Sequence, residues 1–334
     1  MIDFNLQIVG WYRLNKRSLP WRETNDPYHI WLSEIILQQT RVAQGLPYYQ
    51  KFMEQFPTLI DLANADEQEV LRLWQGLGYY SRARNMHQTA KFIAENLKGV
   101  FPKSYAELIK LKGIGAYTAS AIASFCYQEN KAVVDGNVIR VLSRVFDLDV
   151  DCLSTEGKKQ FQALADSLIN GSNPAEHNQA IMEFGALQCT PKNPNCMDCV
   201  LQEKCLSFIS NTVLQRPVKL KKTSIKHRYF HYYILIKNAG IYIRKRDQKD
   251  IWQNMYELPM LEFEKPQPES EQEFFVTKGQ KPHMLSHQKL HIRFFTCEEL
   301  PEACTQDAIW VPFSDLINYP FPKPIEHYIN SYLA

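Results

Sequence analysis

The feature that most constrains this chain is a group of four cysteines. Cys189, Cys196, Cys199 and Cys205 follow the pattern C-x6-C-x2-C-x5-C within seventeen residues. A loop this short suits a single centre, and four thiolates bind either zinc or a cubic iron–sulfur cluster. Structural zinc sites usually combine two C-x2-C pairs with a longer spacer, whereas here one such pair stands between two single cysteines. The spacing favours an iron–sulfur cluster and leaves zinc as the alternative.

The size and composition of the chain are sufficient for two domains, each with its own hydrophobic core, and do not indicate a membrane-spanning protein. It has 334 residues, 45% of them hydrophobic, and no stretch suits a membrane-spanning helix. Residues 1–10 contain Asp3 and lack the basic start and apolar centre of a signal peptide. The scattered remaining cysteines fit a reduced compartment better than a disulfide framework; they are Cys126, Cys152, Cys297 and Cys304. We expect a cytoplasmic protein, associated with the nucleoid if bacterial.

Charge is unevenly distributed along the chain. Residues 213–228 contain six Lys and Arg and no acidic residue, while residues 1–212 and 229–334 carry net charges of −1 and −3. This composition predicts a basic linker between two domains. Its charge serves either solubility or contact with nucleic-acid phosphates, and the sequence leaves both interpretations open.

The two sides of the linker differ in their hydrophobic pattern. From residue 4 to about 209, apolar residues recur at intervals of three and four, which predicts helices. The expected helices are 27–41, 46–56, 67–74, 81–96, 104–111, 117–125, 136–146, 157–169 and 178–187. After the linker, aromatic and β-branched residues predict strands at 229–236, 240–244 and 288–297, and a last helix at 324–333. The fold class is therefore a mainly α domain followed by an α+β domain.

One acidic residue lies in an apolar helix. At helical spacing, Glu34 has Ile30, Trp31 and Leu37 beside it. Burial among such neighbours raises the pKa of a carboxyl, which is the property of a general acid. The alternative is a Glu34 that faces solvent or forms a salt bridge.

A second group of residues follows a glycine-containing turn. Gly113 and Gly115 flank Ile114 between two expected helices, so the backbone N–H groups there either bind a DNA phosphate or form a plain turn. Asp135 precedes a further helix, where it can act as an N-cap and also face a developing positive charge. An acid and an anion together suit the cleavage of a glycosidic bond.

In combination these segments resemble the MutY family of adenine DNA glycosylases, within the helix–hairpin–helix superfamily that includes endonuclease III. The resemblance rests on the cysteine loop, the hairpin and the segments 19–22, 31–34, 37–40, 76–80 and 134–137. It implies a helix–hairpin–helix glycosylase module over 1–212 with a [4Fe–4S] cluster on the four cysteines. It also implies a monomer that binds double-stranded DNA and removes a flipped-out adenine paired with 8-oxoguanine or guanine.

The resemblance assigns roles to residues of this chain. Glu34 corresponds to the acid that protonates adenine N7, and Asp135 to the carboxylate that stabilises the oxocarbenium ion. Tyr117 and Asn137 correspond to their active-site partners. The expected contacts to DNA or to the base are Arg22, Gln39, Thr40, Leu77, Tyr79, Gly113, Gly115 and Gln179.

Position 117 separates two kinds of enzyme. The endonuclease III branch carries a lysine there, which forms a Schiff base and cuts the strand, whereas this chain has Tyr117. The expected enzyme is therefore monofunctional, and a bifunctional glycosylase/lyase is the alternative. The chain departs from the family at Lys112, where the hairpin more often has proline.

Residues 229–334 resemble the MutT-like domain attached to MutY enzymes. The loop that would sense 8-oxoguanine contains Leu285, Ser286 and His287, with Leu285 where an aromatic residue is common. The histidines His283, His287 and His291 suggest a metal site as a weaker interpretation. The pyrophosphatase box is absent, which argues against nucleotide hydrolysis. A catalytically silent DNA-binding protein would lack Glu34 or Asp135, and the chain contains both.

Overall fold

The computed structural model describes residues 2–220, 225–268, 281–285 and 287–333. They form two compact units, the first of Met1–Ala63 and Gln88–Lys221 and the second of Asn64–His87 and Lys222–Ala334. The predicted boundaries at 212 and 229 did not anticipate that a helical segment, 64–87, is grouped with the C-terminal part. The placing of the domain limits at residues 212 and 229 therefore remains a prediction.

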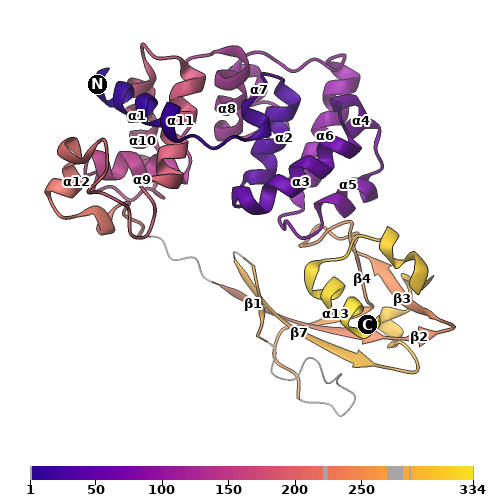
Figure 1. Cartoon of the computed structure of the whole chain (residues 1–334). Coiled ribbons are helices and arrows are strands. Elements are labelled where there is room, and N and C mark those ends of the chain that lie inside the picture. The colour runs from indigo at the N-terminus through magenta and orange to yellow at the C-terminus, as the bar shows by residue number, and fades with distance from the viewer. Residues whose placement is uncertain (1, 221–224, 269–280, 286, 334) are drawn as a thin grey trace. The chain divides into compact units, whose positions relative to one another are not determined.

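The part of the chain before residue 210 is helical, as predicted (Figure 1). Its α-helices are α1 Ile2–Asn15, α2 Pro27–Leu37, α3 Val42–Gln55, α4 Leu59–Asn64, α5 Glu67–Trp74, α6 Ser81–Asn96, α7 Tyr105–Leu108, α8 Ala116–Tyr127, α9 Gly136–Val145, α10 Thr155–Ile169, α11 Pro174–Leu187 and α12 Leu206–Ile209. A short 3-10 helix, η1, spans Pro20–Arg22. Among the described residues, none of these helices combines the length and apolarity needed to cross a bilayer.

Several predicted helix boundaries near the site are wrong. α3 begins at Val42 and not at residue 46, and α7 ends at Leu108 and not at residue 111. α2 ends at Leu37 and not at residue 41, because Gln39 adopts a left-handed φ of 58° and the chain turns there. α11 begins at Pro174 and not at residue 178, with the side chain of Asn173 accepting a hydrogen bond from Glu176 N. An Asn-Pro pair is a common helix start, but the spacing of apolar residues does not reveal it.

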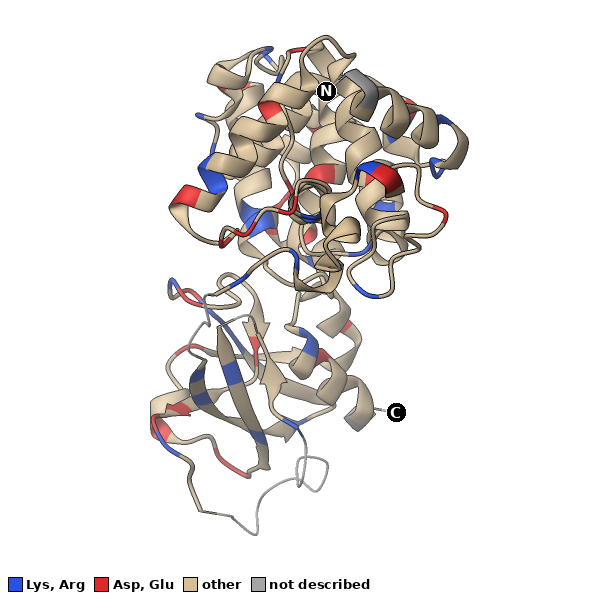
Figure 2. Ribbon diagram, turned by 90° about the vertical axis from the view of Figure 1, so that its left-hand side faces the viewer, with Lys and Arg blue, Asp and Glu red and all other residues tan. Residues whose placement is uncertain are grey.

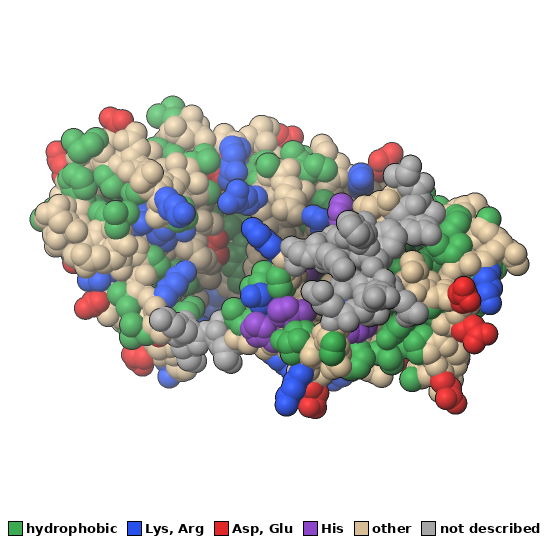
Figure 3. Space-filling model, turned by 90° about the horizontal axis from the view of Figure 1, so that it is seen from below, with side chains coloured by type: hydrophobic (Ala, Val, Ile, Leu, Met, Phe, Trp, Pro, Cys, Tyr) green, Lys and Arg blue, Asp and Glu red, His purple; other side chains and the backbone are tan. Residues whose placement is uncertain are grey.

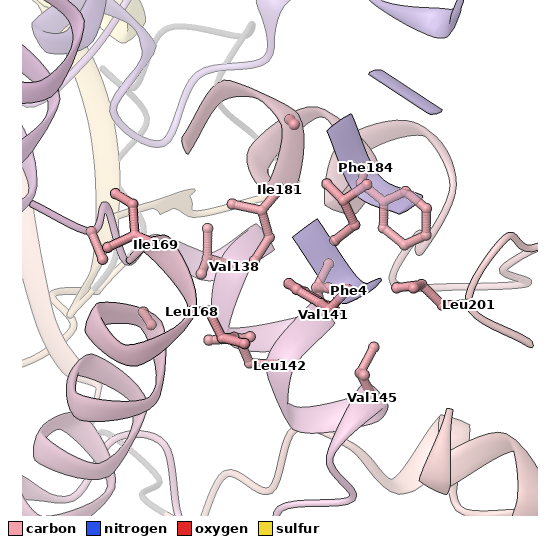
Figure 4. Packing of buried hydrophobic residues seen from close by; sticks show 14 of the residues in the cluster. Phe4, Val138, Val141, Leu142, Val145, Leu168, Ile169, Ile181, Phe184 and Leu201 are labelled. Atoms are coloured by element: carbon pink, nitrogen blue, oxygen red, sulfur yellow. The ribbon is translucent and has the colours of Figure 1, made fainter. Parts of the chain in front are cut away.

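One hydrophobic core of the first unit lies between α1, α9, α10 and α11 (Figure 4). Phe4 of α1, Val141 of α9, Leu168 of α10 and Phe184 of α11 are all buried there. Trp11 meets Phe184 edge to face, with ring centroids 5.0 Å apart. Each such side chain contributes roughly 1.5–3 kcal/mol on burial, so this core holds α9 and α11 in a fixed relation.

A second set of contacts positions α2. This helix packs against α3 and α8, and its buried side chains include Ile30, Trp31 and Ile36. Trp31 lies edge to face with Phe101, at a centroid distance of 5.4 Å. The first turn of α8 lies against the end of α2, since Thr118 Oγ1 accepts a hydrogen bond from Gln38 Nε2 at 3.3 Å.

The C-terminal part contains two sheets and a final helix. The strands are β1 Lys226–Ile234, β2 Ile236–Lys237, β3 Gly240–Lys245, β4 Tyr256–Glu257, β5 Met260–Phe263, β6 His283–Met284, β7 Gln288–Thr296 and β8 Ala308–Pro312. One sheet has the order β5-β1-β7-β6 with β1 and β7 parallel, and the other has β2-β3-β4 with β8 on β3. Helix α13, Lys323–Leu333, stacks Tyr328 on Phe294 at 4.0 Å. The α+β prediction is confirmed.

Two basic residues of the predicted linker form ion pairs. Arg216 bonds Asp147 and Asp149, at 2.9 and 3.2 Å. β1 begins inside the predicted linker, at Lys226, and Arg228 on this strand is buried and bonds Asp250 and Glu262. Figure 2 shows basic positions, in blue, on the strands of the sheet. These two arginines already have carboxylate partners, which weakens the phosphate interpretation for them.

Candidate active site and cysteine loop

A cavity of about 700 Å³ in the first unit gathers most of the predicted active-site residues. Its wall is formed by η1, α2, α8, α9, α11 and the turn after α2. The predicted site residues that line it are Arg22, Glu34, Gln39, Thr40, Tyr117, Asp135, Asn137 and Gln179. They come from five separate segments of sequence, so tertiary packing brings them together.

Glu34 is buried in the wall of this cavity, with 6% of its surface exposed. The Tyr117 hydroxyl donates a hydrogen bond of 2.6 Å to its Oε2. Burial raises the pKa of Glu34 to about 7, the hydrogen bond from Tyr117 opposes the rise, and the charge of Asp135 adds to it. The predicted burial of Glu34 is confirmed, and its side chain can hold or release a proton near neutral pH.

Asp135 caps α9 and also faces the cavity. Its Oδ1 accepts from the backbone N–H groups of Asn137 and Val138, at 2.8 and 2.7 Å, and its Oδ2 accepts from Asn137 Nδ2 at 2.7 Å. Burial raises the pKa of Asp135, and these hydrogen bonds oppose the rise. The two roles weighed for this residue are therefore compatible.

A chain of hydrogen bonds joins Asp135 to the cysteine loop. Asn137 Oδ1 accepts from Arg140 Nη2 at 2.9 Å, and Arg140 Nε donates to the carbonyl of Cys189 at 2.7 Å. One turn later, Arg144 Nη1 lies 3.4 Å from Cys189 Sγ and donates to the carbonyl of Thr190. α9 thus has Asp135, the catalytic candidate, at its N-cap, and its residues Arg140 and Arg144 hold the cysteine loop by hydrogen bonds.

The four predicted ligand cysteines line one cavity beside α9. They are Cys189, Cys196, Cys199 and Cys205, and none forms a disulfide. In the part of the chain that the structure describes, no three side chains of the metal-binding types are arranged around a single ion. Four free thiols that line one space suit a thiolate-ligated centre, and the preference for a cluster over zinc comes from the cysteine spacing.

The hairpin between α7 and α8 has the geometry of a tight turn with an open helix start. Gly113 has a φ of 76°, a left-handed value that favours glycine. Gly115 occupies the N-cap of α8 and provides no side-chain cap, so the first N–H groups of α8 are free of such a partner. The Lys112 ammonium donates to Gln88 Oε1 on the exposed surface. An anion fits at this helix start, and phosphate contact remains a prediction.

The other predicted base-sensing residues lie around a second cavity. Leu77, Tyr79, Leu285 and His287 line a space of about 570 Å³, and all of its lining belongs to the second unit. Leu285 N donates to the carbonyl of Gln288 at 2.8 Å, which closes the turn between β6 and β7. Ser286 lies outside the described residues.

The weaker metal interpretation of the three histidines gains no support. Within the described residues there is no cluster of potential metal ligands. Instead, His291 Nε2 lies 3.0 Å from His227 Nδ1, and Tyr229 stacks on His291 at 4.5 Å. Histidine side chains lie beside hydrophobic ones on the face that Figure 3 shows.

Several residues of the site were not predicted from the sequence. They are Arg17 and Glu183 in the cavity wall, and Arg140 and Arg144 beside the cysteine loop. Glu183 carries a signal similar to that of Glu34, because at helical spacing it has the apolar residues Ala180, Ala186 and Leu187 beside it. The arginines lie on α9 or in a loop, and their contacts reach residues more than forty positions away, which no local pattern shows.

Comparison with known proteins places this fold and site in a class. Residues 32–168 match the HhH-GPD superfamily of base excision DNA repair proteins, and residues 231–331 match the NUDIX domain. The molecule is thus a base excision DNA glycosylase of the helix–hairpin–helix type, with a NUDIX-like C-terminal domain. The relatives described next show that the chain belongs to the adenine DNA glycosylase family.

Two relatives cover most of this chain. The adenine DNA glycosylase of Buchnera aphidicola subsp. Baizongia pistaciae (strain Bp) is 38% identical over 263 residues, which is 77% of this chain and 73% of the relative. That of Buchnera aphidicola subsp. Schizaphis graminum (strain Sg) is 32% identical over 338 residues, 97% and 96% of the two chains. The predicted enzyme class and family are confirmed.

A solved structure supports the helical fold. A thermostable thymine-DNA glycosylase matches with a TM-score of 0.57 and 26% identity, and the match covers 62% of this chain and 95% of that one. The matched part of this chain therefore has the same arrangement of helices as that glycosylase.

Proposed function

We propose that this enzyme excises adenine mispaired with 8-oxoguanine, or with guanine, without cutting the DNA strand. The observation that carries the proposal is the cavity in which buried Glu34, hydrogen-bonded to Tyr117, lies with Asp135. An acid that titrates near neutrality beside a hydrogen-bonded carboxylate is the pairing that glycosidic cleavage requires.

In the proposed reaction, Glu34 acts first as an acid and then as a base, and Asp135 acts as an anion. Adenine leaves the duplex and enters the cavity, and Glu34 donates its proton to N7. The C1′–N9 bond then breaks, its electron pair goes to the base, and Asp135 stabilises the positive charge left on the sugar. Water adds at C1′ and gives up a proton to the Glu34 carboxylate, which restores the acid.

The lack of strand cleavage rests on the groups in the cavity wall. A lyase reaction needs an amine that forms a Schiff base with the sugar. Tyr117 provides none, and no lysine is found among the described residues that line the cavity. The absence of an amine among these described lining residues supports the monofunctional proposal over the bifunctional alternative.

Recognition of the opposite base is proposed for the second cavity. Leu77, Tyr79, Leu285 and His287 surround it, and the resemblance assigns sensing of 8-oxoguanine to the loop that contains Leu285 and His287. Hydrogen bonds worth about 1 kcal/mol each are sufficient to separate 8-oxoguanine from guanine.

This function can be tested directly with the whole chain. It is incubated with duplexes that pair adenine with 8-oxoguanine, guanine, cytosine or thymine, and abasic sites and strand breaks are assayed separately. We expect abasic sites in the first two duplexes and no breaks before alkali treatment. Strand breaks formed by the enzyme alone would instead establish the bifunctional alternative.

The four cysteines are proposed to hold a [4Fe–4S] cluster. When bound, such a cluster supplies a rigid, thiolate-ligated structural support, since base excision transfers no electron. We expect about four irons per chain and a brown colour in anaerobically prepared protein, measured by metal analysis and absorbance. Stoichiometric zinc in that preparation would contradict the assignment.

The pH dependence of excision follows from Glu34. The pKa of this acid is raised to about 7 by burial, so its protonated form is present below that pH and is lost above it. We expect the single-turnover rate on an adenine–8-oxoguanine duplex to fall about tenfold per pH unit above 7. A rate independent of pH between 6 and 9 would show that Glu34 does not donate the proton.

A further inference from the structure

A second carboxylate is buried in the wall of the active-site cavity. Glu183 lies on α11 with 1% of its surface exposed. It accepts hydrogen bonds from Arg17 Nε and Nη2, at 2.8 and 2.6 Å, and from Arg22 Nη1 and Nη2, at 2.9 and 2.8 Å. The backbone N–H of Arg17 adds a fifth, at 3.0 Å. Although burial alone would raise its pKa, these bonds lower the pKa of Glu183 to about 2, so it is ionised at all working pH values.

The two arginines that Glu183 holds line the same cavity as Glu34 and Asp135. Arg22 is restrained further, because its Nη1 donates to the carbonyl of Arg17 at 3.0 Å and its guanidinium lies 5.7 Å from the ring centroid of Tyr12. Their side chains retain 35% and 14% exposure, for Arg17 and Arg22. Both are thus fixed in direction and still accessible from the cavity.

Each arginine keeps one nitrogen for a ligand. A guanidinium has three nitrogens that carry N–H groups. Within the described residues, Arg17 uses Nε and Nη2, and Arg22 uses Nη1 and Nη2, which leaves Arg17 Nη1 and Arg22 Nε without an acceptor. Two cations held by one anion also leave a net positive charge in the wall, which suits a ligand with acceptor atoms and a phosphate backbone.

From these contacts we propose that Glu183 is a positioning residue for adenine excision, and that it orients Arg17 and Arg22 so that their remaining N–H groups bind acceptor atoms of the extruded nucleotide. The proposal rests on the function proposed above. Glu183 itself does not touch the base in this arrangement, because all its acceptor capacity is directed to the arginines. It acts by fixing two side chains that would otherwise sample many rotamers.

The test compares two glutamates of the same helix in the full-length protein. Glu183→Gln removes the charge that holds both arginines. Glu176→Gln is the matched control, since among the described residues Glu176 forms an ion pair only with the exposed Arg13, and neither residue lines the cavity. We expect Glu183→Gln to lower single-turnover excision of adenine about 10- to 100-fold, and Glu176→Gln to change it less than about twofold.

A double-mutant cycle separates positioning from a general structural role. In an Arg17→Gln, Arg22→Gln background, the further change Glu183→Gln should have little effect on the rate, because its partners are already absent. Glu183→Asp, which keeps the charge, should recover part of the activity. All rates are compared well below the melting temperature of each variant. If Glu183→Gln does not fold, the Glu183→Asp substitution is carried through the same cycle.

The outcomes are distinguishable from failure of the proposed function. If the unmodified enzyme does not excise adenine, the proposed function is wrong. If it does, and Glu183→Gln behaves like Glu176→Gln, the positioning role is wrong. An equal loss with and without the two arginines would likewise overturn it, because Glu183 would then act on the fold and not on the arginines.

Discussion

Glu34→Gln is expected to lose adenine excision by about 100- to 10,000-fold, the range that general acid catalysis contributes. Glutamine keeps the shape of the side chain and can still accept the Tyr117 hydroxyl bond, but it carries no acidic proton. Single-turnover rates and DNA dissociation constants, measured on the same adenine–8-oxoguanine duplex, provide the comparison. Binding should persist; an equal loss of binding and rate would instead indicate a structural Glu34.

The same variant has a predicted effect on stability that depends on pH. The pKa of Glu34 is about 7 in the folded chain, against about 4.3 in an unfolded one. Folding therefore favours the neutral carboxyl, so its contribution is complete below pH 4 and is lost as the pH rises through 7. Above that pH, Glu34→Gln should be more stable than the parent, by roughly 1–3 kcal/mol, in denaturant unfolding at pH 8.5 and not at pH 4.

Asp135→Asn is expected to lower excision by about 100-fold or more while lowering stability by only about 1 kcal/mol. Asparagine caps a helix about as well as aspartate, so the bonds to Asn137 N and Val138 N can persist. Two things are lost. One is the bond that Asn137 Nδ2 donates to Asp135 Oδ2, and the other is the negative charge that faces the sugar in the transition state, which contributes a factor of this size in other enzymes.

The capping role of Asp135 is measured by a second substitution. Asp135→Ala should lower both the rate and the stability, the latter by about 0.5–2 kcal/mol, because the cap is lost as well. Rates come from single-turnover excision and stabilities from thermal unfolding. An asparagine variant with full activity would show that Asp135 is only a helix cap.

Local sequence patterns predicted the kind of element at nearly every site-bearing position. The apolar neighbours of Glu34 predicted its burial, and the helix after Asp135 predicted its N-cap bonds; both are observed. The helix ends were less predictable. α2 stops at Leu37 because Gln39 takes a left-handed conformation, which no periodicity of apolar residues encodes.

The cysteine spacing, the tyrosine at position 117 and the order of the motifs came from the sequence by itself, because metal ligands, nucleophiles and caps are properties of residue type and short spacing. Only tertiary structure decided which distant side chains meet. The pairing of Glu183 with Arg17 and Arg22 joins positions more than 160 residues apart, and the Asp135–Asn137–Arg140–Cys189 connection depends on the packing of α9 against the cysteine loop. Contacts between segments follow from how the core packs, and no local pattern of residues contains that information.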